Sequence, residues 1–383
     1  MSDLKNMPGP KLPISIGSHL AIRKEDFDTL LDGLRNLGYE TVGPRIREQA
    51  LVYAPINGIA DLPKGYLSEQ DGGHYRLIQD GHSHYFDITP GAQSWKQFLF
   101  PPRSELFKLA RENGHWHEEL LNTDAPHYAF IGVRGCELAA IAVQDKVFLR
   151  EDFSDPIYKK RRENIFILAA DCFHPCATCF CASMGTGPDA GKGFDLRLTE
   201  LDEVFLIEVG SHLGTKAMQG VPTSEAMRSM LRARETGLKR ARLAMGRELP
   251  EPKKVPELLL SNLEHRRWKD VAIRCLSCTN CTQVCPTCFC WDVEDLTSLN
   301  GATTQRTRVW DSCFNPAYSS QAFGNTRPTT LTRYRQWLTH KMGSWQGQFG
   351  VLGCIGCGRC ITWCPAGIDL TEVIKAMREE QPA

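Results

Sequence analysis

Two cysteine-rich stretches, CLSCTNCTQVCP at residues 275–286 and CIGCGRCITWCP at residues 354–365, decide the fold of the C-terminal part of this chain. Both follow the pattern C-x2-C-x2-C-x3-C-P. In this pattern three thiolates hold the irons of one four-iron cubane, and the fourth cysteine ligates another cubane. The two copies therefore predict two [4Fe-4S] clusters whose motifs exchange one ligand.

The spacing within each motif assigns the cysteines to the two clusters. The first three cysteines of a motif wrap one cubane, and the fourth points away from it. We therefore expect a first set made of Cys275, Cys278, Cys281 and Cys364, and a second set made of Cys285, Cys354, Cys357 and Cys360. Zinc is the alternative metal, but it needs only four ligands in paired C-x2-C groups and leaves the fourth cysteine and its proline unexplained.

The two motifs begin about 79 positions apart, whereas a compact ferredoxin separates them by a few tens of residues. An inserted segment must therefore lie between them. Residues 331–342 in this insertion, and residues 369–380 after the second motif, have the apolar spacing of helices. We expect a mainly α-helical two-cluster ferredoxin domain.

Residues 20–250 have the pattern of a mixed α and β domain. Apolar runs at 127–136, 164–172 and 203–210 are rich in β-branched and aromatic residues, which predicts buried strands of one sheet. The apolar spacing from Glu25 to Leu37, followed by a glycine, predicts a helix.

A basic helical segment at residues 223–248 is expected to be a solvated linking helix, or else a surface for an acidic partner. Three prolines follow within residues 248–257 and mark a boundary. We therefore expect an α+β fold with a mixed α/β domain at residues 1–250 and the α-helical ferredoxin-type domain at residues 251–383.

Five further cysteines lie in the N-terminal domain, and four of them are enough for a third cubane. Two follow predicted strands, so they would meet at the carboxyl edge of the sheet, where α/β proteins bind ligands. We expect a third [4Fe-4S] cluster on a third set made of Cys136, Cys172, Cys179 and Cys181, with Cys176 spare or substituting. Cysteines that pack as small apolar residues, or a redox dithiol, are the alternatives.

Three cysteines lie outside these sets: Cys288, Cys290 and Cys313. They either pack without a metal or lie beside a cluster and shift its potential. The glycine-rich segment at residues 185–195 breaks the phosphate-loop spacing, and no G-x-G-x-x-G follows a predicted strand, so we expect no flavin or nicotinamide bound by the common routes. His115 and His117 lack the spacing of a helical zinc pair and are expected at the surface.

The overall composition is neutral, with 45 basic and 45 acidic residues, so it indicates neither nucleic acid nor an anionic membrane as a partner. The first 20 residues lack the pattern of a secretory signal, and the chain has no apolar stretch long enough to span a bilayer. We therefore expect a cytoplasmic protein whose 16 cysteines stay reduced and bind metal.

The segment at residues 310–374 resembles the beta, iron-sulfur subunit of cytoplasmic NAD(P)-linked [NiFe] hydrogenases, also called sulfhydrogenases. The likeness extends over nearly the whole chain, through GYETVGP (38–44), SWKQFLFP (94–101), GVRGCELAAI (132–141) and TCFCASMGTGP (178–188). The chain departs from the family pattern at Gly135 and Glu137, where proline and aspartate are expected, and at Cys176. The related A subunit of anaerobic sulfite reductase has the same architecture.

The resemblance implies a heterotetramer. Its large subunit carries the nickel-iron site, its small subunit has further clusters, and an FAD subunit reduces NAD(P). The beta subunit would relay electrons through its [4Fe-4S] clusters and catalyse nothing alone. Two alternatives stay open: the electron-transfer A subunit of anaerobic sulfite reductase, and an enzyme that reduces sulfur or disulfides at an open iron of the N-terminal cluster. The sequence leaves open the choice of NAD or NADP, the cluster potentials and the direction of electron flow.

Overall fold

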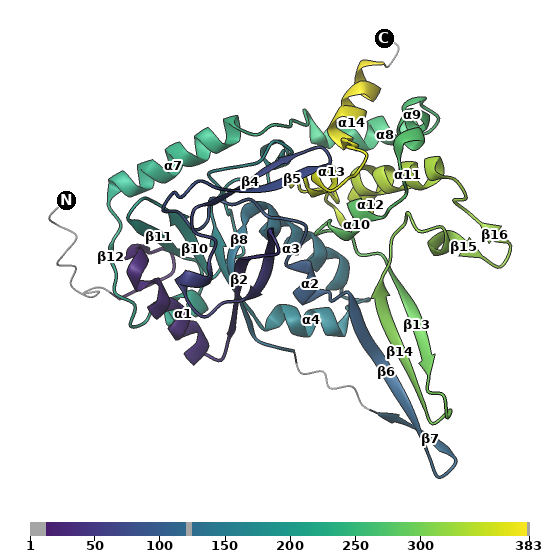
Figure 1. Cartoon of the computed structure of the whole chain (residues 1–383), viewed down its shortest axis with the longest axis horizontal. Coiled ribbons are helices and arrows are strands. Elements are labelled where there is room, and N and C mark those ends of the chain that lie inside the picture. The colour runs from purple at the N-terminus through teal and green to yellow at the C-terminus, as the bar shows by residue number, and fades with distance from the viewer. Residues whose placement is uncertain (1–12, 120–124, 381–383) are drawn as a thin grey trace.

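The computed structural model describes residues 13–119 and 125–380, and its largest element is an eight-stranded mixed sheet (Figure 1). The prediction that the chain lacks a secretory signal depends mostly on residues 1–12, which lie outside the described residues. In spatial order the strands are β12 (Ser224–Glu225), β1 (His19–Arg23), β11 (Val204–Val209), β10 (Leu196–Glu200), β9 (Ile165–Ala170), β8 (Tyr128–Arg134), β2 (Glu40–Arg47) and β3 (Ala50–Pro55).

The centre of this sheet is parallel and apolar on both faces. Strands β2, β8, β9 and β10 pair in parallel, while the remaining pairings are antiparallel. In β9 alternate side chains enter two different cores: Phe166 and Leu168 lie in one, and Ile165 and Ile167 in the other. A continuous apolar run is typical of a strand covered on both faces. The three predicted strands are therefore confirmed, and all belong to one sheet.

Helices cover both faces of the sheet. One core receives α1 (Phe27–Asn36) and α6 (His212–Ala217). The opposite core receives α2 (Lys96–Leu99), α3 (Gly135–Phe148) and α4 (Pro156–Glu163). The long helix α7 (Arg228–Leu243) lies along one side of the molecule (Figure 1). Its Met230 packs in a small core with Val204 and Leu206, and most of its basic side chains are exposed.

The predicted helix at Glu25–Leu37 is confirmed with a shorter range. Its first turn, Lys24–Asp26, is a 3-10 helix, and α1 begins at Phe27. Leu37 is 42% exposed, so it does not join the buried face made by Phe27, Leu30, Leu31 and Leu34. Gly38 follows with a φ of +89°, the left-handed conformation that ends many helices.

A second, four-stranded antiparallel sheet joins the two halves of the chain and projects from the molecule (Figure 1). Its order is β13 (Trp291–Thr297), β14 (Thr303–Trp310), β6 (Arg103–Glu112) and β7 (His115–Glu119). The insertion between the ferredoxin motifs thus contains a β-hairpin that was not predicted from the sequence. Strand β14 follows the boundary proposed near residue 250 and pairs with β6, which precedes it, so this sheet contains strands from both sides. The boundary itself stays a prediction.

The C-terminal part is mainly helical, as expected, and packs around an apolar core to which Phe180 and Leu249 of the preceding part also contribute. Its helices are α8 (Val255–Ser261), α9 (Arg267–Arg274), α10 (Asn280–Gln283), α11 (Thr330–Thr339), α12 (Trp345–Phe349), α13 (Arg359–Thr362) and α14 (Leu370–Glu379). A π-helical turn at residues 340–344 joins α11 to α12.

Two short hairpins complete the described structure. The strands β4 (Tyr66–Asp71) and β5 (His74–Gln79) come from the N-terminal part but contact the second ferredoxin motif, with the rings of Tyr75 and Trp363 4.9 Å apart. The strands β15 (Ser320–Gln321) and β16 (Gly324–Asn325) form the other. None of the helices in the described ranges combines the length and apolar character that a bilayer crossing requires.

Candidate metal centres

The first set of cysteines gathers around one cavity in the helical part. Cys275 follows the end of α9, and Cys281 lies in α10, because the chain turns sharply between these helices at Ser277 and Thr279, both with positive φ. The cavity is lined by all four members of the set and by Cys360, together with the aromatic rings of Phe314, Tyr334 and Trp337. Cys278 is exposed and the other three members are half-buried. Four thiols and an apolar wall suit a cubane cluster.

The second set has no exposed cysteine, unlike the first set. Cys285 is buried, and the remaining members are half-buried around α13. Burial, and then the neighbouring thiols of Cys354 and Cys357, raise the pKa of Cys360. The backbone N–H of Gly356 donates a hydrogen bond of 3.4 Å to the Cys354 sulfur. A backbone donor aimed at sulfur stabilises the thiolate form that a metal requires.

The fourth cysteine of each motif lies with the opposite motif. Cys364 lines the cavity of the first set together with its three other members, and Cys360 of the second motif also reaches this cavity. Cys285 is not part of the lining of that cavity, and its charge acts on Cys354 and Cys357 of the second motif and, as the smallest of several effects, on Cys281 of its own motif. This placement supports the crossed ligation, which itself stays a prediction.

The third set meets at the carboxyl edge of the large sheet, as the sequence predicts. Cys136 lies in the first turn of α3 after strand β8, and Cys172 follows strand β9, which pairs in parallel with β8. Cys181 begins the short helix α5 (Cys181–Met184), and Cys179 lies just before it. The four thiols of the set line one cavity together with Cys357 and Arg359.

Cys176 takes a different position from the third set. Its sulfur lies 3.1 Å from the Cys179 sulfur and 3.3 Å from the hydroxyl of Thr178. It is buried but does not line the cavity that the third set shares. This geometry supports Cys176 as the spare thiol.

The remaining cysteines lie beside the second set. The sequence Cys285-Pro-Thr-Cys288-Phe-Cys290 repeats the pattern of Cys176-Ala-Thr-Cys179-Phe-Cys181. In both copies the sulfur of the first cysteine lies close to the threonine hydroxyl. The distance from the Cys285 sulfur to the Thr287 hydroxyl is 3.1 Å. Hydrogen bonding to Cys285 and then burial raise the pKa of Cys288, while hydrogen bonding from Cys313 lowers the pKa of Cys290 to about 6. These thiols therefore neighbour the second set and each other, at the base of the β13–β14 hairpin.

A buried lysine contacts the second set directly. The ammonium group of Lys341 donates hydrogen bonds to the Cys285 sulfur at 3.2 Å, to the Thr287 hydroxyl at 2.9 Å and to the Gly353 carbonyl at 3.0 Å. Burial opposes its charge, but the Cys285 and Cys288 thiols outweigh burial and raise the pKa of Lys341. A lysine this deeply buried needs a negative partner. No local pattern in the sequence indicated this contact.

A buried ion pair joins the second and third sets. Arg359 donates to Glu137 at 2.6 Å, and both side chains are about 1% exposed. Glu137 also accepts hydrogen bonds from the Tyr53 hydroxyl at 2.9 Å and the Trp95 ring N–H at 3.1 Å. Both charged residues are next to a cysteine in the sequence, and this adjacency was the only signal for the pair. From the sequence, Glu137 was interpreted only as a departure from the family pattern.

The predicted surface histidines are confirmed at the surface. His115 and His117 are exposed on β7, within the projecting sheet. The glycine-rich segment at residues 185–195 instead contacts the third set: a Cβ at Gly187 would lie 2.8 Å from the Cys181 sulfur. Glycine is therefore required there by close approach to a thiol rather than by a phosphate.

Comparison with known proteins identifies a domain in the C-terminal part and the family of the whole chain. A family described as 4Fe-4S dicluster domain matches residues 274–368, which hold both ferredoxin motifs. The beta subunit of sulfhydrogenase 2 from Pyrococcus furiosus is 35% identical over 369 residues, which cover 94% of this chain and 98% of that protein. No solved structure matches this chain. The chain therefore belongs to the family of sulfhydrogenase beta subunits, iron-sulfur proteins with a 4Fe-4S dicluster domain.

Proposed function

We propose that this chain is a non-catalytic electron-transfer subunit of a cytoplasmic, multi-subunit [NiFe] hydrogenase. The observation that carries the proposal is the continuity of the three cysteine sets. Cys357 of the second set lines the cavity of the third set, and Cys360 of the second set lines the cavity of the first. The second set thus adjoins both others, which is the arrangement that sequential one-electron transfer needs.

The residues present fit three four-iron clusters. Twelve thiols, arranged four to a set, match the four cysteine ligands of each cubane. When bound, such clusters accept and release one electron at a time. The chain's own residues hold them, exclude water with aromatic rings and place hydrogen-bond donors on sulfur.

One end of this series reaches the surface. Cys278 is the exposed member of the first set, and its neighbours Ile273 and Leu276 are 76% and 68% exposed. Apolar side chains around an exposed ligand suit transient docking of a redox partner. The first set is therefore the proposed point of electron exchange with another subunit or acceptor.

The buried cations support a redox role for the second set. Lys341 donates to the Cys285 sulfur, and Arg359 lies against Cys357, whose pKa it lowers in opposition to the dominant effect of burial. Positive charge near the sulfurs favours the reduced, more negative state of a cluster. The charge of Arg359 is balanced by Glu137, so Lys341 beside Cys285 is the cation that raises the potential of the second set.

The proposed partners are the large and small subunits of a [NiFe] hydrogenase and a subunit that binds FAD and NAD(P). The relative's name describes it as a subunit of sulfhydrogenase, which supports a hydrogenase complex. Four thiols at the third set allow full ligation of a cluster there, which favours electron transfer over an open catalytic iron. Thiolate ligation also requires a reducing compartment, which supports the cytoplasm.

Purification of the chain from its source with its native partners tests this proposal. We expect nickel and flavin to co-purify with it, and hydrogen gas to bleach its iron-sulfur absorption. A Cys275→Ser variant should keep the complex but lose hydrogen-driven reduction of the acceptor that docks at the first set. Co-purification with a sirohaem protein, together with no response to hydrogen, would contradict the hydrogenase assignment.

A further inference from the structure

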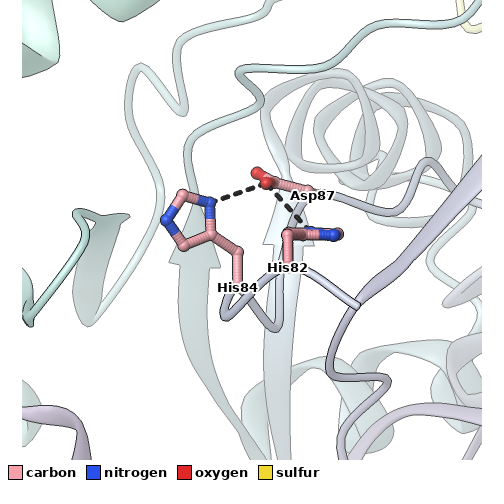
Figure 2. Close-up of side chains that lie close together, drawn as sticks. All are labelled: His82, His84 and Asp87. Atoms are coloured by element: carbon pink, nitrogen blue, oxygen red, sulfur yellow. Dashed lines mark hydrogen bonds and ion pairs between the residues drawn. The ribbon is translucent and has the colours of Figure 1, made fainter. Parts of the chain in front are cut away.

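The turn after β5 carries a compact group of two histidines and one aspartate that the cysteine sets do not use. One ligand atom each from His82, His84 and Asp87 lies within 4.8 Å of the others. Figure 2 shows both imidazole rings directed at the carboxylate of Asp87. The Asp87 Oδ2 atom is 2.7 Å from His84 Nδ1 and 3.2 Å from His82 Nε2.

The three ligand atoms lie close enough together to reach one small cation, and the 2.7 Å contact between Asp87 and His84 would lengthen when the ion binds. With bonds of about 2.0 to 2.1 Å, tetrahedral ligands of zinc lie roughly 3.3 Å from each other. Two imidazole nitrogens and one carboxylate oxygen form a donor set that zinc and similar divalent ions accept. Three protein ligands leave the fourth position for water or another ligand.

Each imidazole ring is also held by a carboxylate on its other nitrogen. Asp80 contacts His82 Nδ1, and Asp202 lies 3.3 Å from His84 Nε2. A carboxylate that accepts a hydrogen bond from the N–H of one ring nitrogen leaves the lone pair of the other nitrogen free for a metal. Such carboxylate–histidine–metal arrangements are typical of protein metal sites.

A cluster of ion pairs around Asp87 is the simpler explanation, and one atom argues against it. His82 Nε2 is buried and has no hydrogen-bond partner of good geometry among the described residues, although Asp87 is near. A buried nitrogen without a hydrogen bond is costly. A bound cation at this position would satisfy it.

The surrounding backbone fixes the group in place. Glu200 accepts hydrogen bonds from the N–H groups of Tyr85 and Phe86 at 2.9 and 2.7 Å. The Arg134 guanidinium donates to the Ile88 carbonyl at 2.9 Å, beyond the other side of Asp87. The aspartate is only 7% exposed. The ligands are therefore held by the edge of the large sheet rather than by a loose loop.

We propose that His82, His84 and Asp87 bind a divalent transition-metal ion, with Zn²⁺ as the representative ion. The second oxygen of Asp87 lies 2.9 Å from His174 Nδ1, and His174 stands between Cys172 and Cys176 in the chain. The ion thus fastens the turn at residues 80–87 to the segment that carries the third set. This site is independent of the proposed electron-transfer function.

Zinc binding to the full chain, purified anaerobically with its clusters in place, tests the proposal. We expect calorimetry to show about one Zn²⁺ per chain for the wild type and none for a His82→Ala, His84→Ala double variant. A matched double variant, His115→Ala with His117→Ala, removes two exposed histidines of β7 and should bind like the wild type. The wild type and both double variants must have the same iron content, because cysteine sites without a cluster would also bind zinc.

A milder change keeps the test valid if the double variant loses its clusters. Asp202→Asn alters an aspartate whose side chain is 91% exposed, so folding should not depend on it. It removes the carboxylate that orients His84, and we expect a loss of roughly 10- to 100-fold in zinc affinity. Equal zinc binding by the wild type and the double variant would overturn the site, as would an unchanged affinity in Asp202→Asn.

Discussion

The replacement Lys341→Met is expected to lower the reduction potential of the cluster proposed on the second set. The lysine is 3% exposed and donates a 3.2 Å hydrogen bond to the Cys285 sulfur. The methionine side chain is similar in length to that of lysine but is apolar and uncharged. The replacement therefore removes both the hydrogen bond and the positive charge. The cysteine ligands themselves are unchanged.

The size of the shift follows from Coulomb's law. A unit charge 3.2 Å from another interacts by roughly 5 kcal/mol at an effective dielectric constant of about 20. For a one-electron couple, about 59 mV corresponds to 1.36 kcal/mol, so this upper bound equals roughly 220 mV. An added electron is shared by the whole cluster rather than held at one sulfur, so we expect about half, on the order of 100 mV.

Redox titration followed by electron paramagnetic resonance measures this shift. Lys341→Arg keeps the positive charge and should restore most of the potential. Lys375→Met, which neutralises a lysine 73% exposed on α14, should change nothing measurable because solvent screens its charge. If Lys341→Met retained its full iron content and every potential stayed within about 20 mV of the wild type, the assigned role of Lys341 would be refuted.

Three further predictions concern ligation and stability. Cys285→Ser is expected to alter the signals of the cluster carried by Cys354, Cys357 and Cys360; spectra that change only at the other ferredoxin cluster would exclude crossed ligation. Cys176→Ala should keep the wild-type iron content, whereas Cys181→Ser should reduce it; equal iron loss in both variants would make Cys176 a ligand. Arg359→Met leaves Glu137 charged and unpaired in the interior, so we expect a loss of about 3 to 5 kcal/mol of stability, seen as a lower unfolding temperature, and Arg359→Met with Glu137→Gln should recover part of it.

Local patterns were enough to predict the parts of the fold that short-range chemistry determines. The motif spacing predicted that Cys364 lies with Cys275, because a cubane dictates how many residues separate its ligands, and both cysteines line one cavity. The apolar runs identified β8 and β9, and their parallel pairing brings Cys136 and Cys172 to one edge. These features depend on periodicity and on ligand geometry.

Features that depend on contacts between segments far apart in the sequence were not predicted. The hairpin β13–β14 completes a sheet with β6, nearly 200 residues earlier in the chain, and no local pattern encodes that pairing. The roles of Lys341 and Arg359 arise only because folding places them against sulfur and Glu137. Likewise, the histidine group depends on Asp202, which lies on a strand connection far from His84 in sequence.

Iron analysis of the anaerobically purified full chain, with Mössbauer spectroscopy to identify the cluster type, tests the central claim most directly. Three complete cysteine sets predict about 12 iron atoms per chain, all in [4Fe-4S] form. A reproducible value near 8 that does not rise on reconstitution would mean that Cys136, Cys172, Cys179 and Cys181 hold no cluster. The continuous series of three sites would then be contradicted.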